Sequence, residues 1–437
     1  MNKLLYKIKV LAILLFINHI SYGQTSIKQY VKSQATQVKH IDINQNDFTD
    51  LEQLGDAIGE ARIVALGEQM HGDGTTFEAK GRIIRYLHEK KGFNLIVFES
   101  DFFGLTYGFE TIKTKSKDTL NQFIFHNLLG LWSWCKNAKN FFYDYIHQTQ
   151  STPTPLILAG MDCQNQSQYS FENLQPKLRD ILSKLIESKR DSINVNIILD
   201  NLSTTFFNGQ KANPYGCENG INALDGLLNE KPLHQLNKEE LNIIANVEAS
   251  FRNILPLLQK KQQYATKHLY RDRQMFDNLM YLLKYKYPNE KAIIWAHNAH
   301  IVKSAPAFND NKDSVLMTGH LLGNKKTNPY TYYAIGVTSY NATSIYTATI
   351  ESPIHAQKPS KNSFETWVNK KWDYAFVNWR NLPETTFESP PFMMKGSFES
   401  TQHMNFNYQW NKVFDGIFFI RNIAGCSTLK YNDVIKE

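Results

Sequence analysis

Four short apolar runs, each ending in a cluster of polar residues, dominate the pattern of this chain. They lie at 61–71 (ARIVALGEQMH), 93–101 (FNLIVFESD), 155–163 (PLILAGMDC) and 291–300 (KAIIWAHNAH). The apolar part of each run shows no polar alternation, which is typical of a strand buried on both faces of a parallel sheet. Ligands bind beside the carboxyl ends of such strands. We therefore expect the polar residues that follow the runs to share one crevice: Glu68, His71, Glu99, Asp162, His297 and His300.

Helical patterns connect the first three runs. The spacing of apolar positions predicts an amphipathic helix over 76–90 and a second helix around 136–148, between strands at 61–68, 94–100 and 156–161. This alternation of strand and helix is the βαβ pattern of a parallel sheet.

The stretch from about 165 to 285 has a different character, because polar helical patterns replace the strand-like runs. Helices are expected at 174–189 and 238–261. The segment 208–218 (NGQKANPYGCE) is rich in turn-forming residues, which indicates a loop. We expect a helical insertion between the third and fourth strands.

Strand-like segments return after the fourth run. They lie at 330–340, 343–350, 373–379 and 414–422. A short polar turn separates the first two, so we expect antiparallel members in a mainly parallel, mixed sheet. Hydrophobic residues make up 42% of the chain, which is ample for a sizeable core.

The N-terminus has the pattern of a secretory signal peptide over residues 1–23. Three lysines precede an apolar run from Val10 to Ile17, and a short polar stretch closes on Gly23. That run is well short of the ~20 residues that span a bilayer, so we expect no stable membrane insertion after cleavage. The mature protein, 24–437, is expected outside the cytoplasm, in the periplasm or beyond the cell.

Charge and cysteine content exclude several classes of protein. The formal charge of +7 falls to +4 without residues 1–23, and the lysines are dispersed, which argues against a nucleic-acid surface. The sequence does not indicate the oligomeric state. The cysteines are too few and scattered for a disulfide scaffold or a CxxC zinc site, although one pair could be bridged. They are Cys135, Cys163, Cys217 and Cys426.

Common catalytic fingerprints are absent from the sequence. It contains no G-x-S-x-G, H-E-x-x-H, G-x-x-x-x-G-K-[ST] or G-x-G-x-x-G motif. Chemistry must therefore rest on acid, base and cation side chains. Glu68 could orient His71, and a neutral imidazole held in this way suits a general base. The alternative is a capping glutamate beside a loop histidine without a catalytic role.

The other candidates follow the same logic. His297 and His300 lie three residues apart, so both could point into one crevice if a helix starts there. Glu99 follows an apolar run and needs a cation or hydrogen-bond partner; Lys80 and Arg82 are the nearest by sequence. For Glu99 and Asp162 a structural ion pair is the alternative. Trp132 is expected to line an apolar wall for the substrate.

The order and spacing of the motifs resemble the erythromycin esterase family over most of the mature chain. The matching stretches are ARIVALGEQMHG at 61–72, RIIRYLHEKKGFNLIVFES at 82–100, LILAGMDCQ at 156–164, RDRQMFDN at 271–278, IIWAHNAHI at 293–301, MTGHLLG at 317–323, YAIGVTSY at 333–340 and FDGIFFI at 414–420.

The resemblance implies a three-layer α/β/α fold with a helical insertion, and a hydrolase that opens a macrolactone with water. The family's G-E-x-x-H residues fall on Glu68 and His71, its next active-site glutamate on Glu99, and its H-N-x-H histidines on His297 and His300. Its active-site arginine falls on Lys80, which keeps the charge but loses the planar fork. A family acidic position is Thr75 in this chain.

The leading hypothesis is a metal-independent carboxylic ester hydrolase without a cofactor, acting on a macrolide or another bulky ester. His71 would deprotonate water, and Lys80 with His297 and His300 would stabilise the oxyanion or protonate the alkoxide. Glu99 would hold the Lys80 cation in place. A metal-dependent hydrolase in the same crevice and a non-catalytic ligand-binding protein of the envelope are the alternatives.

Overall fold

A computed structural model describes residues 27–114, 116–207, 213–259, 264–304, 317–345, 353–383, 390–396 and 403–435. The expected signal peptide, at 1–23, lies outside the described residues. None of the described helices combines the length and the apolar character that a bilayer crossing requires.

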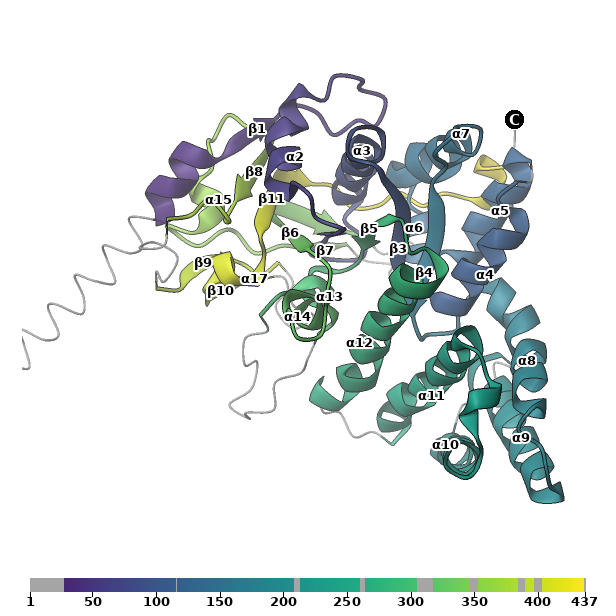
Figure 1. Cartoon of the computed structure of the whole chain (residues 1–437). Coiled ribbons are helices and arrows are strands. Elements are labelled where there is room, and N and C mark those ends of the chain that lie inside the picture. Colours follow the sequence, from purple (N-terminus) through teal and green to yellow (C-terminus); the bar gives the residue numbers. More distant parts are fainter. Residues whose placement is uncertain are drawn as a thin grey trace, which may run out of the picture.

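A nine-stranded mixed sheet forms the centre of the protein (Figure 1). Its order is β1-β8-β11-β6-β2-β5-β3-β4, with β7 paired to β6. The six strands from β11 to β4 in this order are parallel. Strand β8 is antiparallel to both of its neighbours, β11 and β1, and β7 is antiparallel to β6. The strands are β1 Thr36–Val38, β2 Ile63–Leu66, β3 Phe93–Asp101, β4 Ile157–Asp162, β5 Lys291–Trp295, β6 Tyr332–Ser344, β7 Ile354–His355, β8 Tyr374–Asn378 and β11 Gly416–Ile423. A separate two-stranded sheet pairs β9 Phe392–Lys395 with β10 Asn405–Tyr408.

Helices cover both faces of the sheet, so the expected three-layer α/β/α architecture is confirmed. Alternate residues of β2, Val64 and Ile63, belong to two different apolar clusters, one on each side of the sheet. The first cluster includes α3 and α5, and the second includes α12, α13 and α14. Helices outside the insertion are α2 Glu52–Ile58, α3 Gly74–Lys91, α4 Phe102–Ile112, α5 Lys117–Asn127, α6 Gly130–Ser133, α7 Ile146–Thr149, α13 Asn298–Ile301, α14 Thr318–Gly323, α15 Phe364–Trp367 and α17 Trp410–Val413. Short 3-10 turns lie at Thr49–Leu51, Lys136–Ala138 and Tyr431–Asp433, and a π-helical stretch at Asn140–Tyr145 precedes α7.

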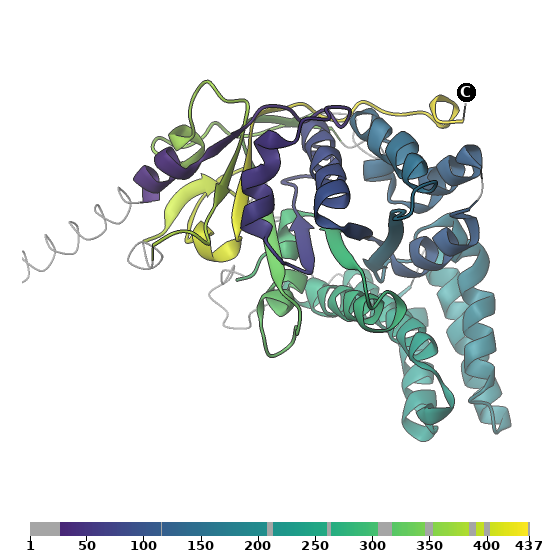
Figure 2. The same ribbon diagram turned by 45° about the horizontal axis from the view of Figure 1, so that its top comes forward.

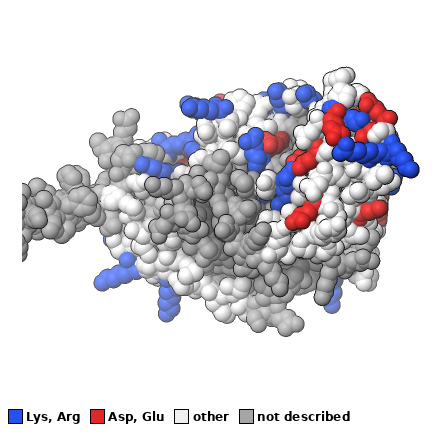
Figure 3. Space-filling view, turned by 90° about the horizontal axis from the view of Figure 1, so that it is seen from below, with Lys and Arg blue, Asp and Glu red and all other residues white. Residues whose placement is uncertain are grey.

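Helices fill the chain between β4 and β5 and project from the end of the sheet (Figures 1 and 2). They are α8 Gln168–Ser183, α9 Lys189–Leu202, α10 Pro214–Glu230, α11 Lys238–Leu258 and α12 Tyr264–Tyr281. Short π-helical stretches follow α9 at Ser203–Phe207 and α12 at Leu282–Lys286, and a 3-10 turn lies at Leu233–Gln235. Residues of α8 to α11 form an apolar cluster of their own, while α12 packs on the sheet. On the face seen in Figure 3, acidic and basic side chains lie interspersed at the right-hand end.

Several expected boundaries in the insertion are wrong. The helix expected at 174–189 begins at Gln168 and ends at Ser183, because Ser188 starts α9 with a capping box. The loop expected at 208–218 extends no further than Asn213, whose side chain caps α10 ahead of Pro214 at the first helical turn. Residues 208–212 lie outside the described part.

The antiparallel members of the sheet are confirmed, but the expected reason for them is wrong. No turn breaks the chain near 341, because β6 continues from Tyr332 to Ser344 beside β11. The end of the segment expected at 343–350 lies outside the described residues. Antiparallel pairing comes instead from β8, which lies between β1 and β11, and from β7, which pairs with β6.

A disulfide joins Cys135 to Cys426, across 291 residues of sequence. Cys163 and Cys217 are buried free thiols. The bridge links the segment after α6 to the chain that follows β11.

Candidate active site

The polar residues that end four neighbouring strands meet at one cavity. Strands β2, β5, β3 and β4 are adjacent and parallel, so their carboxyl ends lie along one edge of the sheet. A cavity of about 300 Å³ opens there. The residues that line it are His71, Glu99, Ser100, Asp101, Asn127, Leu128, Leu129, Leu131, Asp162, Gln164, Gln166, Ser167, Arg271, His297, Ala299 and His300.

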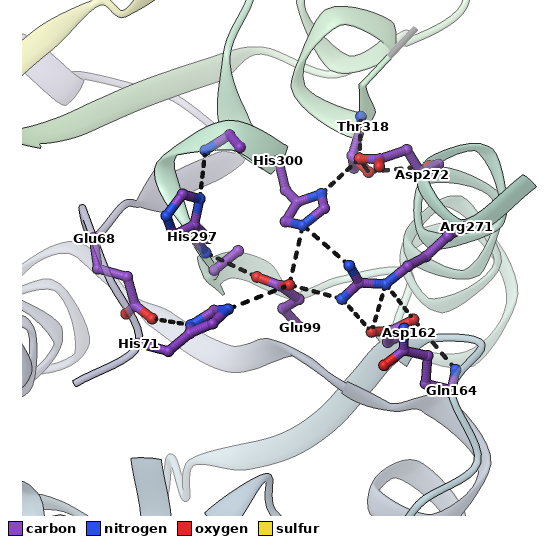
Figure 4. A network of polar contacts seen from close by, with 12 residues as sticks. Glu68, His71, Glu99, Asp162, Gln164, Arg271, Asp272, His297, His300 and Thr318 are labelled. Carbon is purple, nitrogen blue, oxygen red and sulfur yellow. Dashed lines mark hydrogen bonds and ion pairs between the residues drawn. The ribbon is translucent and has the colours of Figure 1, made fainter. Parts of the chain in front are cut away.

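Glu68 orients His71 from behind the cavity (Figure 4). Its Oε1 lies 2.7 Å from Nδ1 of His71 and accepts a hydrogen bond of 2.8 Å from the indole of Trp132. Lys80 donates to Oε2 at 2.5 Å. Glu68 is fully buried, whereas His71 is 22% exposed. Trp132 and Lys80 thus fix the carboxylate, which in turn fixes the imidazole.

The environment of His71 favours its protonated form. Burial alone would lower the pKa of His71, but the hydrogen bond to Glu68 and the negative charges of Glu99 and Glu68 outweigh burial and raise it above 6.5. Its Nε2 lies 3.9 Å from Oε1 of Glu99, across the cavity edge. The imidazole therefore becomes a base only as pH rises through this raised pKa.

Glu99 is the centre of the polar network in Figure 4. Nη2 of Arg271 donates to its Oε1 at 2.7 Å, and the backbone N–H of His297 donates to its Oε2 at 2.8 Å. Nε2 of His300 lies 3.0 Å from Oε1. Burial would raise the pKa of Glu99, but the charges of His300, Arg271 and His71 hold it well below 4.5. Glu99 is therefore ionised at neutral pH.

Arg271 joins two carboxylates that end different strands. Besides Glu99, it contacts Asp162 through Nε, at 3.1 and 3.0 Å, and through Nη2, at 2.6 Å. The side chain comes from α12, the helix that packs on the sheet. This planar fork matches carboxylates in a way that lysine does not.

His300 is held as a cation between two carboxylates. Its Nδ1 lies 2.8 Å from Oδ1 of Asp272, which also accepts from the N–H and the hydroxyl of Thr318. Burial would lower the pKa of His300, but Asp272 and Glu99 raise it to about 10. Both ring nitrogens contact carboxylates, so the imidazolium contributes a fixed positive charge beside the cavity.

This raised pKa makes stability depend on pH. A histidine whose pKa rises on folding contributes stability that is complete below about pH 6.5 and disappears as pH rises through about 10. We therefore expect the wild-type free energy of unfolding to fall across that window, and that of His300→Asn to fall much less. Urea unfolding at several pH values measures the difference; parallel curves would contradict it.

His297 also borders the cavity, but both ring nitrogens contact the backbone. Nε2 lies 2.7 Å from the carbonyl of Gln69, and Nδ1 accepts from the N–H of Ala299 at 3.1 Å. Burial and the nearby charge of His71 lower the pKa of His297 to about 4. The structure therefore places it as a neutral support for the ends of β2 and β5, and not as the expected proton donor.

Two further expectations from the sequence need correction. Lys80 does not line the cavity: its Nζ contacts Glu68 and the carbonyl of Ala296 and lies over the ring of Trp295, on the far side of Glu68. Trp132 is not among the lining residues either; its side chain is fully buried behind Glu68, to which its indole donates. Both side chains support Glu68 and lie outside the cavity lining.

The cation that pairs with Glu99 was assigned to the wrong residues. Arg82, the other candidate, is buried against Asp50. Arg271 pairs with Glu99, and Asp272 pairs with His300. Neither residue was among the candidates from the sequence. The adjacent charges of RDRQ in an otherwise amphipathic helix were the available signal. Thr75 contacts the backbone of Ala424 and does not border the cavity.

Within the described residues, no group of three or more His, Cys, Asp and Glu side chains is arranged to hold a metal ion. The carboxylates at the cavity are paired with Arg271, His300 and the backbone instead.

At this cavity a buried carboxylate orients a histidine, and cationic side chains lie nearby. This arrangement is typical of the active site of a hydrolase. The chain belongs to the erythromycin esterase family, whose model matches residues 88–423. Glu68, His71 and Lys80 precede the matched range. Family and fold together support an esterase or hydrolase.

Individual proteins and solved structures are similar to this chain over most of its length. Erythromycin esterase type II of Escherichia coli is 24% identical over 451 residues, which cover 90% of this chain and 97% of that protein. A solved structure of a mutant erythromycin esterase EreC in its open conformation has a TM-score of 0.67 and 17% identity, over 92% of this chain and 100% of EreC. A structure described as a succinoglycan biosynthesis protein has a TM-score of 0.69 and 21% identity, over 93% of this chain and 99% of that chain. Such identities show a shared fold.

Proposed function

We propose that the protein is a carboxylic ester hydrolase in which His71 activates water directly. The observation that carries this proposal is the hydrogen bond of 2.7 Å between Glu68 and Nδ1 of His71. It places the Nδ1 proton toward the carboxylate, so that in the neutral tautomer Nε2 is an acceptor on the cavity side.

The proposed reaction uses the described groups in order. Nε2 of His71 takes a proton from water as the hydroxide attacks the ester carbonyl. Arg271 and the His300 imidazolium border the same cavity and would stabilise the oxyanion that develops. When the acyl–oxygen bond breaks, His71 returns the proton to the alkoxide. Ester and water thus become acid and alcohol, without a covalent enzyme intermediate.

Mass spectrometry of ester substrates tests this proposal. We expect the mature protein to add one water to erythromycin or to another member of a panel of macrolactones and bulky esters. The rate should survive a chelator, because the site residues are paired with one another and no metal enters the proposed steps. Loss of turnover with the chelator, restored by a divalent metal, would favour the metal-dependent alternative. Binding without turnover of any ester would favour the ligand-binding alternative.

The walls of the cavity support a bulky, amphipathic ester as the substrate. Leu128, Leu129 and Leu131 form one wall, and Gln164 and Gln166 carry amides on the lining. Leu128 belongs to an apolar cluster and Leu129 packs against it. Of the described leucines that line the cavity, only Leu131 lies outside the three apolar clusters.

Leu131 is therefore available to contact the substrate. We expect Leu131→Ala to raise KM roughly three- to tenfold for esters with large apolar acyl groups, with little effect on acetyl esters. Leu257→Ala, at an exposed leucine of α11, is the matched control. Equal changes in KM for large and small esters would show that Leu131 does not select the substrate.

We also propose that the protein works outside the cytoplasm, in the periplasm or beyond the cell. The pattern of residues 1–23 and the disulfide between Cys135 and Cys426 support this location.

A further inference from the structure

The chain that follows β11 lies between two parts of the candidate site. We call residues 424–429 the tail segment. Figure 2 shows the C-terminal chain, in yellow, running from β11 past α3 toward α5. The loop that carries His71 lies on one side of the tail segment, and the segment that carries Trp132 lies on the other.

The tail segment is hydrogen-bonded to the loop of the proposed base. The N–H of Cys426 donates to the carbonyl of Gly72, the residue after His71, at 3.0 Å. The N–H of Ala424 donates to the hydroxyl of Thr75 at 2.9 Å, and the N–H of Thr75 donates to the carbonyl of Ala424 at 3.2 Å. The backbone on both sides of the turn after His71 is therefore anchored to this segment.

The tail segment is also joined to the chain after Trp132. Cys426 forms the disulfide with Cys135. The N–H of Lys136 donates to the carbonyl of Ser427 at 2.8 Å, and the N–H of Leu429 donates to the carbonyl of Trp134 at 2.7 Å. One covalent bond and two hydrogen bonds thus fix the 132–136 segment to the tail segment.

The three segments approach closely enough to require glycine. A Cβ on Gly74 would lie 2.7 Å from Oδ1 of Asn137 and 3.0 Å from the carbonyl oxygen of Gly425. The loop, the tail segment and the 132–137 chain therefore pack as one unit, and a shift of one of them displaces the others.

Trp132 connects this unit to the chemistry. Its indole donates to Oε1 of Glu68, the same oxygen that contacts Nδ1 of His71. Its ring meets the ring of His71 edge-on, with centroids 5.6 Å apart. Because the Trp132 indole and His71 share this oxygen, the position of Trp132 affects the strength of the hydrogen bond between Glu68 and His71.

We propose that the tail segment and its disulfide form a positioning device that holds Trp132 on Glu68 and thereby sets the orientation and basicity of His71. Trp132, Cys135 and Cys426 are positioning residues, since they act through Glu68. The inference rests on the proposed function for its role in catalysis. The titration of His71 tests it without any turnover.

The experiment follows the His71 imidazole by NMR as pH is varied, with its signal assigned by its loss in His71→Asn. Trp132→Phe removes one hydrogen-bond donor from Glu68, so the carboxylate stabilises the His71 imidazolium more strongly. We therefore expect the pH midpoint of His71 to rise by about half a unit to one unit, which is the size of one hydrogen bond. The double variant Cys135→Ser, Cys426→Ser should move it in the same direction. Reduction of the wild type with dithiothreitol should do the same: the two sulfurs gain two electrons and two protons, and the reagent becomes its cyclic disulfide.

On an ester that the wild type hydrolyses, kcat/KM should fall roughly ten- to a hundredfold in each variant.

Two matched controls separate positioning from general damage. Trp134→Phe changes a second tryptophan of the same segment, whose indole donates to the carbonyl of Phe125. Cys217→Ser changes a buried free thiol of α10. Both controls should leave the His71 midpoint unchanged.

Unchanged midpoints in folded Trp132→Phe and in the folded double variant, with only a lower Tm, would overturn the proposal. If the double variant does not fold, reduction of the folded wild type decides the role of the disulfide, and Trp132→Phe decides the role of the indole; an unchanged midpoint in both would overturn the proposal. If the wild type hydrolyses no ester, the proposed function fails, while a shifted midpoint still supports the positioning device.

Discussion

His71→Asn is expected to lower kcat/KM for ester hydrolysis by roughly 10²- to 10⁴-fold while the protein remains folded. Asparagine keeps a polar side chain near Glu68 but cannot take a proton from water. Because His71 is partly exposed and lies in a loop, its loss should affect the apolar clusters little. Steady-state kinetics and thermal unfolding of the same preparation measure both effects.

The matched control for this prediction is His126→Asn. His126 is an exposed histidine of α5 outside the cavity lining. It should retain wild-type kinetics. A well-folded His71→Asn protein with wild-type kcat/KM would remove His71 from the mechanism, and His300 would become the first residue to test as the acid or base.

Arg271→Met is expected to have the largest effect on stability, a loss of about 3–5 kcal/mol in the free energy of unfolding. The side chain of Arg271 is 12% exposed, and it pairs with Glu99 and Asp162, whose side chains are 2% and 3% exposed. Its removal leaves two buried carboxylates with fewer donors, although His300 still contacts Glu99. Urea unfolding measures the loss, and hydrolysis should disappear as well, because Arg271 borders the cavity.

Arg273→Met, two residues along α12, is the matched control for Arg271→Met. Arg273 is 59% exposed, and its ion pair with Asp277 lies within its own helix, so its loss should change stability by no more than about 0.5 kcal/mol. Arg271→Lys should lie between the two, because lysine keeps the charge without the fork. If Arg271→Met were as stable as Arg273→Met, the carboxylates would not depend on this cation.

The sheet edge could be predicted from sequence because its signals are local. A buried strand and the polar residue that ends it occupy fewer than ten residues, and parallel strands must end on the same side. The pairing of Glu68 with His71 is equally local. Local sequence signals are therefore enough to predict that the candidate residues share one edge of the sheet.

Contacts that depend on the insertion could not be predicted in this way. Arg271 reaches Glu99 across 172 positions and Asp162 across 109. Nothing local shows that α12 turns this residue toward β3 and β4. Proximity in sequence favoured Lys80 and Arg82 as partners of Glu99, but Lys80 turns to Glu68 and Arg82 to Asp50. For the same reason, four cysteines did not reveal which two are bridged.

The disulfide also bears on proteolysis. Cys135 and Cys426 enclose the whole insertion, including every helix from α8 to α12. A single cut by a protease in any loop of that region produces two fragments that remain linked through sulfur. Asp162, Arg271 and His300 would therefore stay attached to Glu68 and His71, whichever fragment carries them. A nicked molecule could keep its cavity assembled, and the two pieces would separate only after reduction.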